Sequence, residues 1–382
     1  MSSPVVDLAV ADLTIRRFRG LRDVELSGLG QVSILVGEND AGKTSVLEAL
    51  KLYSAPESPW TWIETAGQRE PRSFTSRVDR LRYLFPGERE GGQTGVEGGT
   101  IEVMGVGAFE PRGFTAICRH LCGSEAERAR EEEGICGRDE FVPPDLERRG
   151  IEISVKPRYE TERSPASKHE ETTAERSFTF WDDQRLWSAA RGSLSRSECL
   201  VITPYDHWID RLAVLFSKAK LDGYVDAVLE LVTRLDPNIT GIEVIAPRVG
   251  ADSVLYLRDR SAGLLPLSAF GDGLRRVLLI ALGLPRMAGG LLLIDEVETA
   301  IHVSVLGEVF RWIVEASRQH EVQVVVTTHS LEALDAILAA DTTPEEDVVA
   351  YRLSRAEGRV AVKRFGEDLL RRLRRDRGLD VR

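Results

Sequence analysis

Residues 37–44 read Gly-Glu-Asn-Asp-Ala-Gly-Lys-Thr, a loop that begins with one glycine and ends with a second, followed by a lysine and a hydroxyl. In this G-x-x-x-x-G-K-[ST] pattern the glycines let backbone N–H groups turn toward phosphate oxygens, and the next helix N-terminus adds a positive dipole. Lys43 would reach the β- and γ-phosphates of ATP, and the Thr44 hydroxyl would ligate Mg²⁺. A chance glycine turn is the weaker alternative, because the loop lies between an apolar run and a predicted helix. The residues expected to contact the nucleotide are Gly37, Glu38, Asn39, Asp40, Ala41, Gly42, Lys43, Thr44 and Ser45.

A second group of candidate residues follows the apolar run Leu291–Ile294, which ends in Asp295 and Glu296. We expect this run to be a buried strand beside the strand that precedes the phosphate loop, so that Asp295 approaches Mg²⁺, usually through water. Glu296 can then polarise the water that attacks the γ-phosphate. An acidic pair can also be only the solvated start of a loop, but the upstream phosphate loop favours the catalytic interpretation.

His329 follows another apolar run, residues 322–326, within the sequence Thr327-Thr328-His329-Ser330. A histidine just past a buried strand of the same sheet could reach the γ-phosphate or the attacking water. The alternative is that Thr328 or Ser330 caps the next helix and that the histidine is incidental. Capping and catalysis are compatible, and we favour a catalytic role.

A fourth candidate segment, Leu-Ser-Ala-Phe-Gly-Asp-Gly at residues 267–273, opens a predicted helix. Ser268, Gly271 and Gly273 would make an anion-binding surface at the helix N-terminus. The residue types alone fit an ordinary N-cap and a flexible turn equally well. The position of the segment between the phosphate loop and the acidic pair favours the functional interpretation.

These residues must be positioned by an alternation of buried strands and helices. The strands read as continuous apolar runs, which a sheet covered by helices on both faces requires. Residues 55–200 differ, because glycine pairs and charge runs dominate there and predict an insertion with surface loops and short strands at 151–155 and 177–180. Elsewhere we expect strands at 13–18, Val32–Val36, 242–245, 254–257, Leu291–Ile294 and 322–326, helices at 42–55, 212–235, 273–284, 305–317 and Leu331–Ala340, and a hairpin over 348–363.

The fold class predicted is α/β: a P-loop NTPase with a mixed sheet, helices on both faces, an antiparallel β subdomain and an inserted region. The expected division assigns residues 1–55 and 235–382 to the ATPase core and residues 56–234 to the inserted lobe. A chain of 382 residues with 42% hydrophobic residues can bury such a core. The net charge of −11 argues against a protein that coats nucleic acid over its whole surface, but allows a local basic patch at residues 371–377.

We expect a cytoplasmic protein without a membrane span. The first ten residues lack the basic start of an export signal, and the longest apolar stretch is interrupted by Pro285 and Arg286. Four cysteines in a chain of this length fit a reducing compartment. A cluster that matches no common zinc module, and that we interpret as thiols in an insertion, consists of Cys118, His120, Cys122 and Cys136.

The order of phosphate loop, serine- and glycine-rich helix start, acidic pair and histidine resembles the ABC-type ATPase superfamily, and within it the RecF/SMC/OLD-like group of AAA family ATPases. The segments "LTIRRFRGLRDVEL", "VSILVGENDAGKTSVLEAL", "LLLIDEVETAIH" and "VVVTTHS" carry this resemblance, which spans residues 13–55 and 235–365. It implies Walker A roles for Lys43 and Thr44, the Walker B role for Asp295, catalysis by Glu296, a signature of Ser268, Gly271 and Gly273, and a switch role for His329.

Some residues depart from the family pattern. Ala269, Phe270 and Asp272 differ from the LSGGQ form of transporter ATPases, and Val297 replaces a proline that often follows the acidic pair. Glu298 and His302 also echo the family, or they mark no more than the face of a helix. The departures in the signature weaken a transporter assignment.

In this superfamily the signature of one subunit completes the ATP site of the other, so the resemblance implies a homodimer that encloses two ATP molecules. Residues 330–382 are too few for a TOPRIM nuclease domain, and residues 44–294 leave no room for long coiled-coil arms. We therefore expect a stand-alone ATPase that works with a separately encoded effector, and with DNA as a second candidate partner, in DNA maintenance or phage defence. The alternative is a nucleotide-dependent interaction module with negligible turnover that holds an effector inactive.

Overall fold

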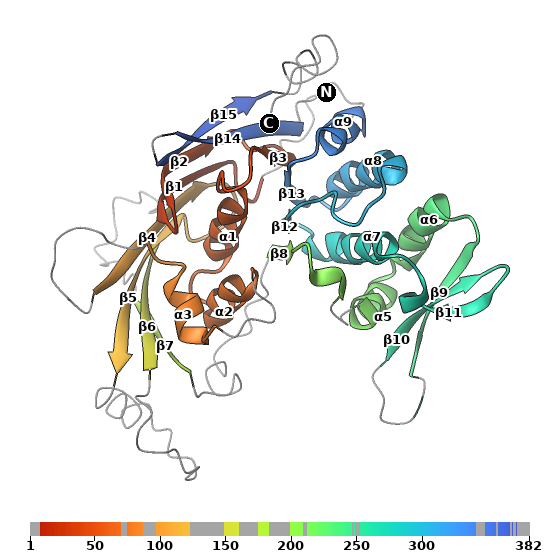
Figure 1. Cartoon of the computed structure of the whole chain (residues 1–382), viewed down its shortest axis with the longest axis horizontal. Coiled ribbons are helices and arrows are strands. Elements are labelled where there is room, and N and C mark those ends of the chain that lie inside the picture. The colour runs from red at the N-terminus through yellow and green to blue at the C-terminus, as the bar shows by residue number, and fades with distance from the viewer. Residues whose placement is uncertain are drawn as a thin grey trace, which may run out of the picture. The chain divides into compact units, whose positions relative to one another are not determined.

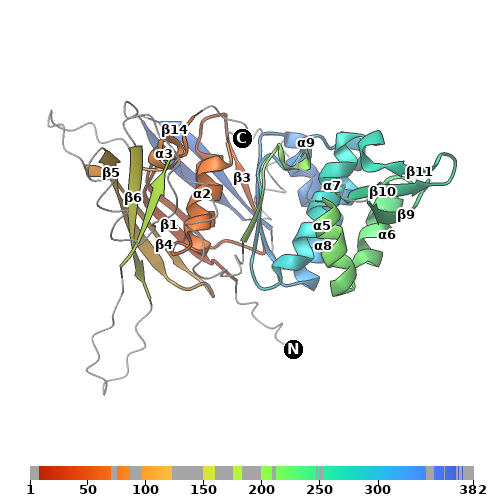
Figure 2. The ribbon, with the colours of Figure 1, turned by 90° about the horizontal axis from the view of Figure 1, so that it is seen from below.

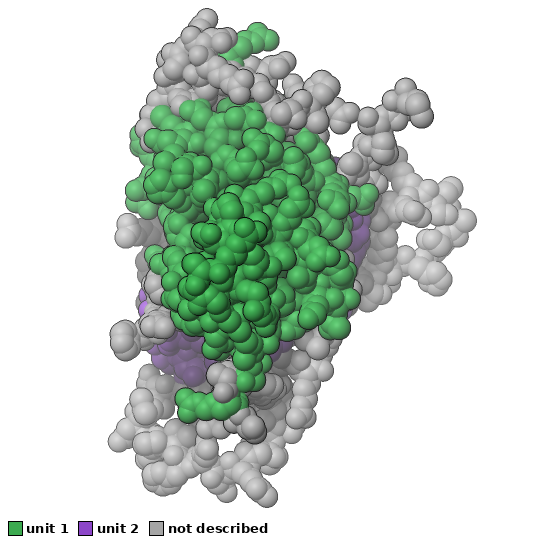
Figure 3. Space-filling view, turned by 90° about the vertical axis from the view of Figure 1, so that its right-hand side faces the viewer, with its two compact units in different colours: residues 1–11, 26–47, 198–382 green, residues 12–25, 48–197 purple. Residues whose placement is uncertain are grey.

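The computed structural model describes most of the chain and divides it into two compact units (Figure 1). Unit 1 comprises Met1–Ala11, Leu26–Leu47 and Glu198–Arg382, and unit 2 comprises Asp12–Glu25 and Glu48–Ser197 (Figure 3). The described residues are 8–69, 75–86, 97–122, 149–159, 175–182, 199–208, 212–246, 248, 253–340, 348–356, 358–366, 369 and 372.

Unit 1 is built on a six-stranded sheet with the order β15-β14-β3-β13-β12-β8. Five of its strands are parallel and β15 runs antiparallel to β14, so the sheet is mixed, as predicted. The middle strands β3, β13 and β12 are buried along their whole length, which explains their unbroken apolar sequences. The bounds of the strands are β3 Val32–Val36, β8 Cys199–Ile202, β12 Leu291–Ile294, β13 Gln323–Thr328, β14 Val348–Ala356 and β15 Arg359–Phe365.

The order of these strands corrects one sequence prediction. The strand that ends in the acidic pair, β12, does not pair with the phosphate-loop strand β3, because β13 lies between them. Val326 of β13 pairs with Ile34 of β3 and with Ile294 of β12. The residues of a strand that is apolar throughout do not indicate which strands lie beside it, so the order could not be predicted from the sequence. The consequence is that residues at the end of β13 lie between the two loops.

Helices of unit 1 cover one face of this sheet. Val32, Ile34 and Val36, alternate residues of β3, belong to the same apolar core as residues of α5–α9. Residues 212–235, predicted as one helical stretch, form two helices, because Gly223 between them has a φ of +82° that favours glycine. The helices are α5 Leu212–Asp222, α6 Val225–Leu235, α7 Asp272–Gly283, α8 Val303–Gln319 and α9 Leu331–Ala340.

A separate three-stranded antiparallel sheet, β9 to β11, precedes the segment at residues 267–273 in unit 1. Figure 2 shows this sheet beside α5 and α6, and Leu255 and Leu257 of β10 join the core of unit 1. Residues 249–252, between the first two of these strands, lie outside the described residues. The strands are β9 Ile239–Ile245, β10 Val254–Asp259 and β11 Gly263–Pro266.

Unit 2 contains a second six-stranded sheet, which is antiparallel in its pairs β1·β4, β4·β5, β5·β6 and β6·β7. Where the sequence predicted surface loops with short strands, the chain forms long strands whose residues alternate between buried and accessible positions, as in β6. The order of the strands is β2-β1-β4-β5-β6-β7. Their bounds are β1 Asp12–Phe18, β2 Leu21–Ser27, β4 Glu97–Val106, β5 Gly113–Cys122, β6 Arg149–Arg158 and β7 Arg176–Trp181.

Several aromatic rings pack in the core of unit 2. Trp62 stacks on Phe85 with ring centroids 5.9 Å apart and meets Phe114 of β5 edge-on at 6.1 Å. Trp62 lies on α2 (Pro59–Gly67), which is followed by α3 (Arg77–Arg82). Such large rings supply the apolar area that holds the helices against the sheet.

The two units divide the chain differently from the expected boundaries at residues 55 and 235. Residues 12–25 belong to unit 2, whereas α5 and α6, which lie within the expected lobe, belong to unit 1 because they share its apolar core. Helix α1 (Lys43–Ser54) begins in unit 1 and ends in unit 2. Cys136 and the expected basic helix, apart from Arg372, lie outside the described residues.

Candidate functional site

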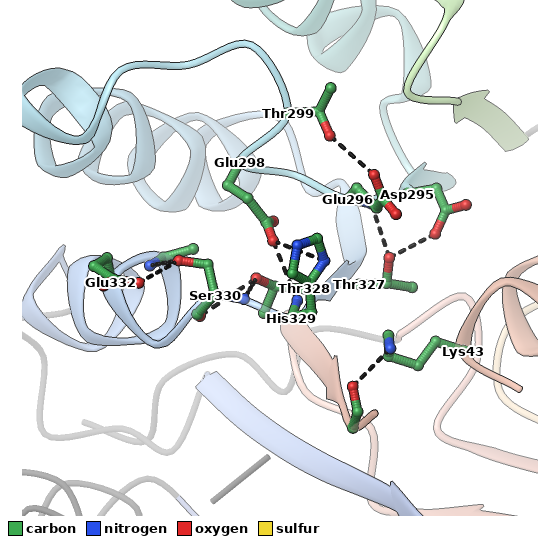
Figure 4. A network of polar contacts seen from close by, with 12 residues as sticks. Lys43, Asp295, Glu296, Glu298, Thr299, Thr327, Thr328, His329, Ser330 and Glu332 are labelled. Carbon is green, nitrogen blue, oxygen red and sulfur yellow. Dashed lines mark hydrogen bonds and ion pairs between the residues drawn. The ribbon is translucent and has the colours of Figure 1, made fainter. Parts of the chain in front are cut away.

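The carboxyl ends of β3, β13 and β12 meet at one edge of the unit 1 sheet, because the three strands are parallel. The loops that leave this edge carry the phosphate loop, the acidic pair and the histidine segment. Figure 4 shows Lys43, Asp295, Glu296 and His329 in this region. Open parallel sheets place ligand sites at this edge, so the sheet assembles three of the four predicted segments in one place.

The phosphate loop folds tightly. Gly37 and Gly42 have φ values of 149° and 96°, and Asp40 has a φ of 61°, all in the region that disfavours most side chains. A Cβ atom at Gly37 would lie 2.3 Å from the carbonyl oxygen of Leu353, so only glycine fits at this position. Glu38, Asn39 and Asp40 are exposed at the tip of the loop, while Ala41 and Ser45 are buried at its base.

Lys43 is the first residue of α1, and its ammonium group reaches back over the loop. Nζ donates hydrogen bonds to the carbonyl oxygens of Gly37 at 2.7 Å and Glu38 at 2.9 Å. Burial lowers the pKa of Lys43, and the nearby carboxylates of Asp295 and Glu296 oppose that shift. The first turn of α1 contains no acidic residue, so the helix N-terminus and this cation together supply positive charge beside the carboxylates of Asp295 and Glu296.

The carboxylate of Asp295 joins the phosphate loop to β13. The Thr44 hydroxyl donates to both of its oxygens, at 3.0 and 3.2 Å, and the Thr327 hydroxyl donates to Oδ1 at 2.6 Å. A hydroxyl and a carboxylate at the edge of a phosphate loop are the oxygen ligands that Mg²⁺ prefers. The arrangement therefore fits the predicted assignment of Thr44 and Asp295 to the metal.

Thr327 is a site residue that the sequence analysis did not single out. Its hydroxyl donates to Asp295 and accepts a hydrogen bond from the backbone N–H of Glu296 at 2.8 Å. It is fully buried at the end of β13. The signal in the sequence was a polar residue at the end of an otherwise apolar strand. Only the position of β13 between β3 and β12 shows that this residue contacts the acidic loop.

Glu296 lies on a strained turn. Its φ of 46° turns the backbone sharply after Asp295, and its Oε2 accepts a hydrogen bond from the Thr299 hydroxyl at 3.1 Å. Non-glycine residues with such φ values are enriched at functional sites, where surrounding contacts hold them in place. The Thr299 contact fixes the carboxylate of Glu296 beside the acidic loop.

Arg276 is the second site residue that sequence reasoning missed, and it comes from α7. Its side chain is fully buried and donates to the backbone carbonyls of Thr203, of Asp295 at 2.8 Å and of Glu296 at 3.3 Å. Burial lowers its pKa to about 10, against the opposing effect of nearby carboxylates such as Asp206. The signal in the sequence was a charged residue on the apolar face of a helix.

The signature segment is connected to the acidic loop through α7. A Cβ atom at Gly273 would lie 2.6 Å from the carbonyl oxygen of Ala300, so α7 approaches the turn closely there. Ser268, in a 3₁₀ turn, and Gly271, the N-cap of α7, are both exposed. The structure thus brings Gly273 against the acidic loop and leaves Ser268 and Gly271 at the surface.

His329 contacts Glu298, the third residue after β12's acidic aspartate. Oε1 of Glu298 lies 3.1 Å from the backbone nitrogen of His329 and 3.4 Å from its Nδ1.

The expected cap of the helix after His329 is also present, because Ser330 Oγ accepts from the backbone N–H of Ala333 at 3.1 Å. His302 accepts from the backbone N–H of Ser304 at 3.2 Å and caps α8. Glu298 lies on a turn and His302 at an N-cap, so neither marks the face of a helix.

Two further properties of the described residues bear on function. In the ranges that the structure covers, no group of three or more His, Cys, Asp or Glu side chains could hold a metal ion. The same ranges contain no helix long and apolar enough to cross a membrane. Cys118, from the cysteine-rich segment, is a free thiol buried in β5.

A protein-family model matches residues 153–335, with the description "AAA domain, putative AbiEii toxin, Type IV TA system". The match includes the signature, acidic and histidine segments, and it does not include the phosphate loop. Two proteins of Methanocaldococcus jannaschii are also similar. The uncharacterized protein MJECL11 is 32% identical over 122 residues, which are 29% of this chain and 98% of that protein. The uncharacterized protein MJECL10 is 46% identical over 44 residues. These residues are 12% of this chain and 20% of MJECL10, so this chain spans one fifth of that protein's length.

Among solved structures, an Smc head bound to the C-terminal winged-helix domain of ScpA is 12% identical, with a TM-score of 0.48 over 94% of this chain and 97% of the other. The SMC head domain of Thermotoga maritima is 13% identical, with a TM-score of 0.41 over 94% and 99% of the two chains.

Proposed function

The chain belongs to the ABC-type AAA family of ATPases, and from this premise we propose that it is an ATP-hydrolysing switch whose nucleotide-bound homodimer gates an effector protein or a DNA transaction. The observation that carries the proposal is the Asp295 carboxylate held between the hydroxyls of Thr44 and Thr327. This contact couples the phosphate loop to the two strands whose loops carry Glu296 and His329. A change at the phosphates can therefore reach both catalytic candidates.

The phosphate loop binds the triphosphate in this proposal. Backbone N–H groups at the start of α1 face the phosphate oxygens, and Lys43 exchanges its loop carbonyls for the β- and γ-phosphates. Thr44 and Asp295 hold Mg²⁺, which neutralises negative charge on the phosphates when bound. The remaining chemistry belongs to side chains at the ends of β12 and β13.

Glu296 is the proposed general base. Its carboxylate accepts a proton from the water that attacks the γ-phosphate, while the Thr299 hydroxyl, 3.1 Å from Oε2, holds the carboxylate in place. His329 lies on the neighbouring strand end and completes the group that faces the attacked phosphate.

The proposed dimer follows from the exposed signature. Ser268 and Gly271 lie at the surface, where the helix N-terminus of α7 is open to an anion from a second copy. Nucleotide then acts as a removable part of the interface, and dimerisation depends on its concentration. Gly273, packed against Ala300, connects this surface to the acidic loop of the same subunit.

The output of the switch is proposed to be a separately encoded effector in the cytoplasm, in phage defence or DNA maintenance. The description of the matching family, which names a toxin of a type IV TA system, supports a defence role. Contact with DNA would fall to basic residues near the end of the chain, such as Arg372. A salt titration tests this part, because binding through phosphates weakens steeply with salt.

Nucleotide binding and turnover are the first test. We expect Lys43→Ala to weaken ATP binding at least about 100-fold in calorimetry, because the phosphate loop loses its only side-chain cation. Lys218→Ala, which removes an exposed lysine of α5, is the matched control and should bind normally. Equal binding by the two variants would contradict the proposed site.

Turnover separates the switch from the interaction module. We expect Glu296→Gln to bind ATP, to lose at least about 100-fold in phosphate release, and to sediment as an ATP-dependent dimer. Glu308→Gln, an exposed carboxylate of α8, should behave as wild type. Wild-type protein that binds ATP and dimerises without releasing phosphate would favour the interaction module instead.

A further inference from the structure

The turn after β12 is fastened to the end of β13. The backbone N–H of Val297 donates to the carbonyl oxygen of Thr327 at 3.0 Å, and the Val297 side chain is fully buried. Within the turn, Ile301 donates to the carbonyl of Glu298 at 3.0 Å, and Ala300 has a φ of 64°. The position of Glu298 is therefore fixed by its neighbours on both sides, opposite the residues that follow β13.

Glu298 uses this position to contact His329 twice. The same oxygen, Oε1, accepts the backbone N–H of His329 at 3.1 Å and lies 3.4 Å from the ring nitrogen Nδ1. The Glu298 side chain is 14% exposed, whereas the His329 side chain is 53% exposed. The Nδ1 edge of the ring thus faces a largely buried carboxylate, and the rest of the ring faces outward.

The two neighbouring carboxylates of this turn have different partners. Glu296 accepts from Thr299, on the same turn, whereas Glu298 contacts the loop after the next strand. The backbone geometry causes this separation, because the φ of 46° at Glu296 reverses the chain before Val297 is anchored. The Oε2 atom of Glu298 is buried without a donor among the residues that the structure describes. A buried carboxylate oxygen without a donor is unfavourable, so the contacts of Oε1 with His329 must hold Glu298 in this position.

We propose that Glu298 is the positioning residue for His329: it accepts the Nδ1–H, fixes the plane of the ring, and leaves Nε2 as the nitrogen that faces the attacking water. A carboxylate at one ring nitrogen decides which tautomer a neutral histidine adopts. With the proton on Nδ1, the lone pair of Nε2 accepts a hydrogen bond from the attacking water. The inference rests on the proposed function for the role of His329, but the pairing itself is independent of turnover.

The ring tautomer tests the pairing directly. We expect ¹⁵N spectra of histidine-labelled protein at neutral pH to show the Nδ1–H tautomer for one of the six histidines, assigned by its loss in His329→Gln. Glu298→Ala should shift this ring to the Nε2–H tautomer, and Glu298→Gln, which keeps an oxygen acceptor, should preserve Nδ1–H. Glu308→Gln is the control. An unchanged tautomer in Glu298→Ala, with the other histidine signals intact, would overturn the proposal.

Turnover kinetics test whether the pair acts as a unit. Glu298→Ala should lower kcat roughly 10- to 100-fold, as when the hydrogen-bonded partner of a metal-ligating histidine is removed, with little change in KM. Glu298→Gln should recover most of this loss. In a His329→Ala background, Glu298→Ala should have no further effect, because coupled residues are not additive. Additive losses would contradict a positioning role. Wild-type protein without turnover would refute the proposed function, and the tautomer would still decide the pairing.

Discussion

The two six-stranded sheets of this protein differ in where their polar side chains lie. In unit 1, parallel strands are buried on both faces, and polar side chains gather where β12 and β13 end. In unit 2, residues along β6 alternate between buried and accessible positions, and ion pairs such as Arg158 with Glu102 lie on accessible positions. The comparison teaches that a parallel sheet concentrates its chemistry at one edge, whereas an antiparallel sheet distributes charge over a face.

Each unit nevertheless contains a charged side chain with no exposed surface, Arg276 in unit 1 and Glu48 in unit 2, and their partners differ in kind. Arg276 in unit 1 donates to backbone carbonyls of the loops after β8 and β12. Glu48 in unit 2, fully buried on α1, accepts from two guanidinium groups, those of Arg19 at 3.0 Å and Arg69 at 2.8 Å. The first connects loops of the site, while the second neutralises a carboxylate within the lobe. Mutations at the two positions can therefore test whether the units are stabilised separately.

The largest effect is expected for Arg276→Met. The substitution keeps the apolar stem but leaves carbonyl oxygens of Thr203, Asp295 and Glu296 without their donor, at a cost of about 3–5 kcal/mol. Hydrogen exchange measured by mass spectrometry should speed up in β12, β13 and α7 and stay unchanged in β4–β6. Arg311→Met, at an exposed pair of α8, is the control and should cost at most about 1 kcal/mol. An equal increase in the rate of hydrogen exchange in both units would show that the two units are not stabilised separately.

Glu48→Ala should have the next largest effect, confined to unit 2. Removing the carboxylate leaves the largely buried guanidinium of Arg19 unpaired, whose pKa burial already lowers and Glu48 raises. The expected loss is about 3 kcal/mol of local stability, seen as faster exchange in β1, β4 and α3. The matched variant Glu102→Ala, which breaks the accessible pair with Arg158, should cost at most about 1 kcal/mol. Similar losses in the two variants would show that burial of Glu48 has no energetic consequence.

The smallest effect concerns alkaline pH and unit 2 alone. Burial raises the pKa of the Cys118 thiol to about 12, from an ordinary value of 9, and that of Tyr53 to about 12, from 10. The unfolded chain releases these protons at lower pH than the native protein does, so stability is fully present below pH 9 and falls as the pH rises toward 12. Alkylation of Cys118 at pH 8 should accordingly require opening of unit 2. Rapid labelling in the native protein would contradict this burial.

The sequence predicted those parts of unit 1 in which local pattern and tertiary role coincide. Val32–Val36, the glycine loop after it and the start of α1 follow from residue types alone, because glycine at Gly37 and Gly42 and a continuous apolar strand leave few alternatives. The buried strand Leu291–Ile294 and the two carboxylates that follow it were equally predictable from the sequence. In unit 2 the alternation of β4 to β6 was obscured by glycines and by charges on accessible positions, so long strands were predicted as loops.

The sequence by itself determined which loops carry phosphate-binding, acidic and histidine chemistry, since each depends on neighbours along the chain. Only the tertiary structure decided that β13 separates β3 from β12, that Thr327 holds Asp295, and that Arg276 supports the acidic loop from α7. It also paired His329 with Glu298. These pairings join separate strands and helices, so they depend on how those elements are arranged in the fold, and strands that are apolar throughout do not specify their neighbours in a sheet.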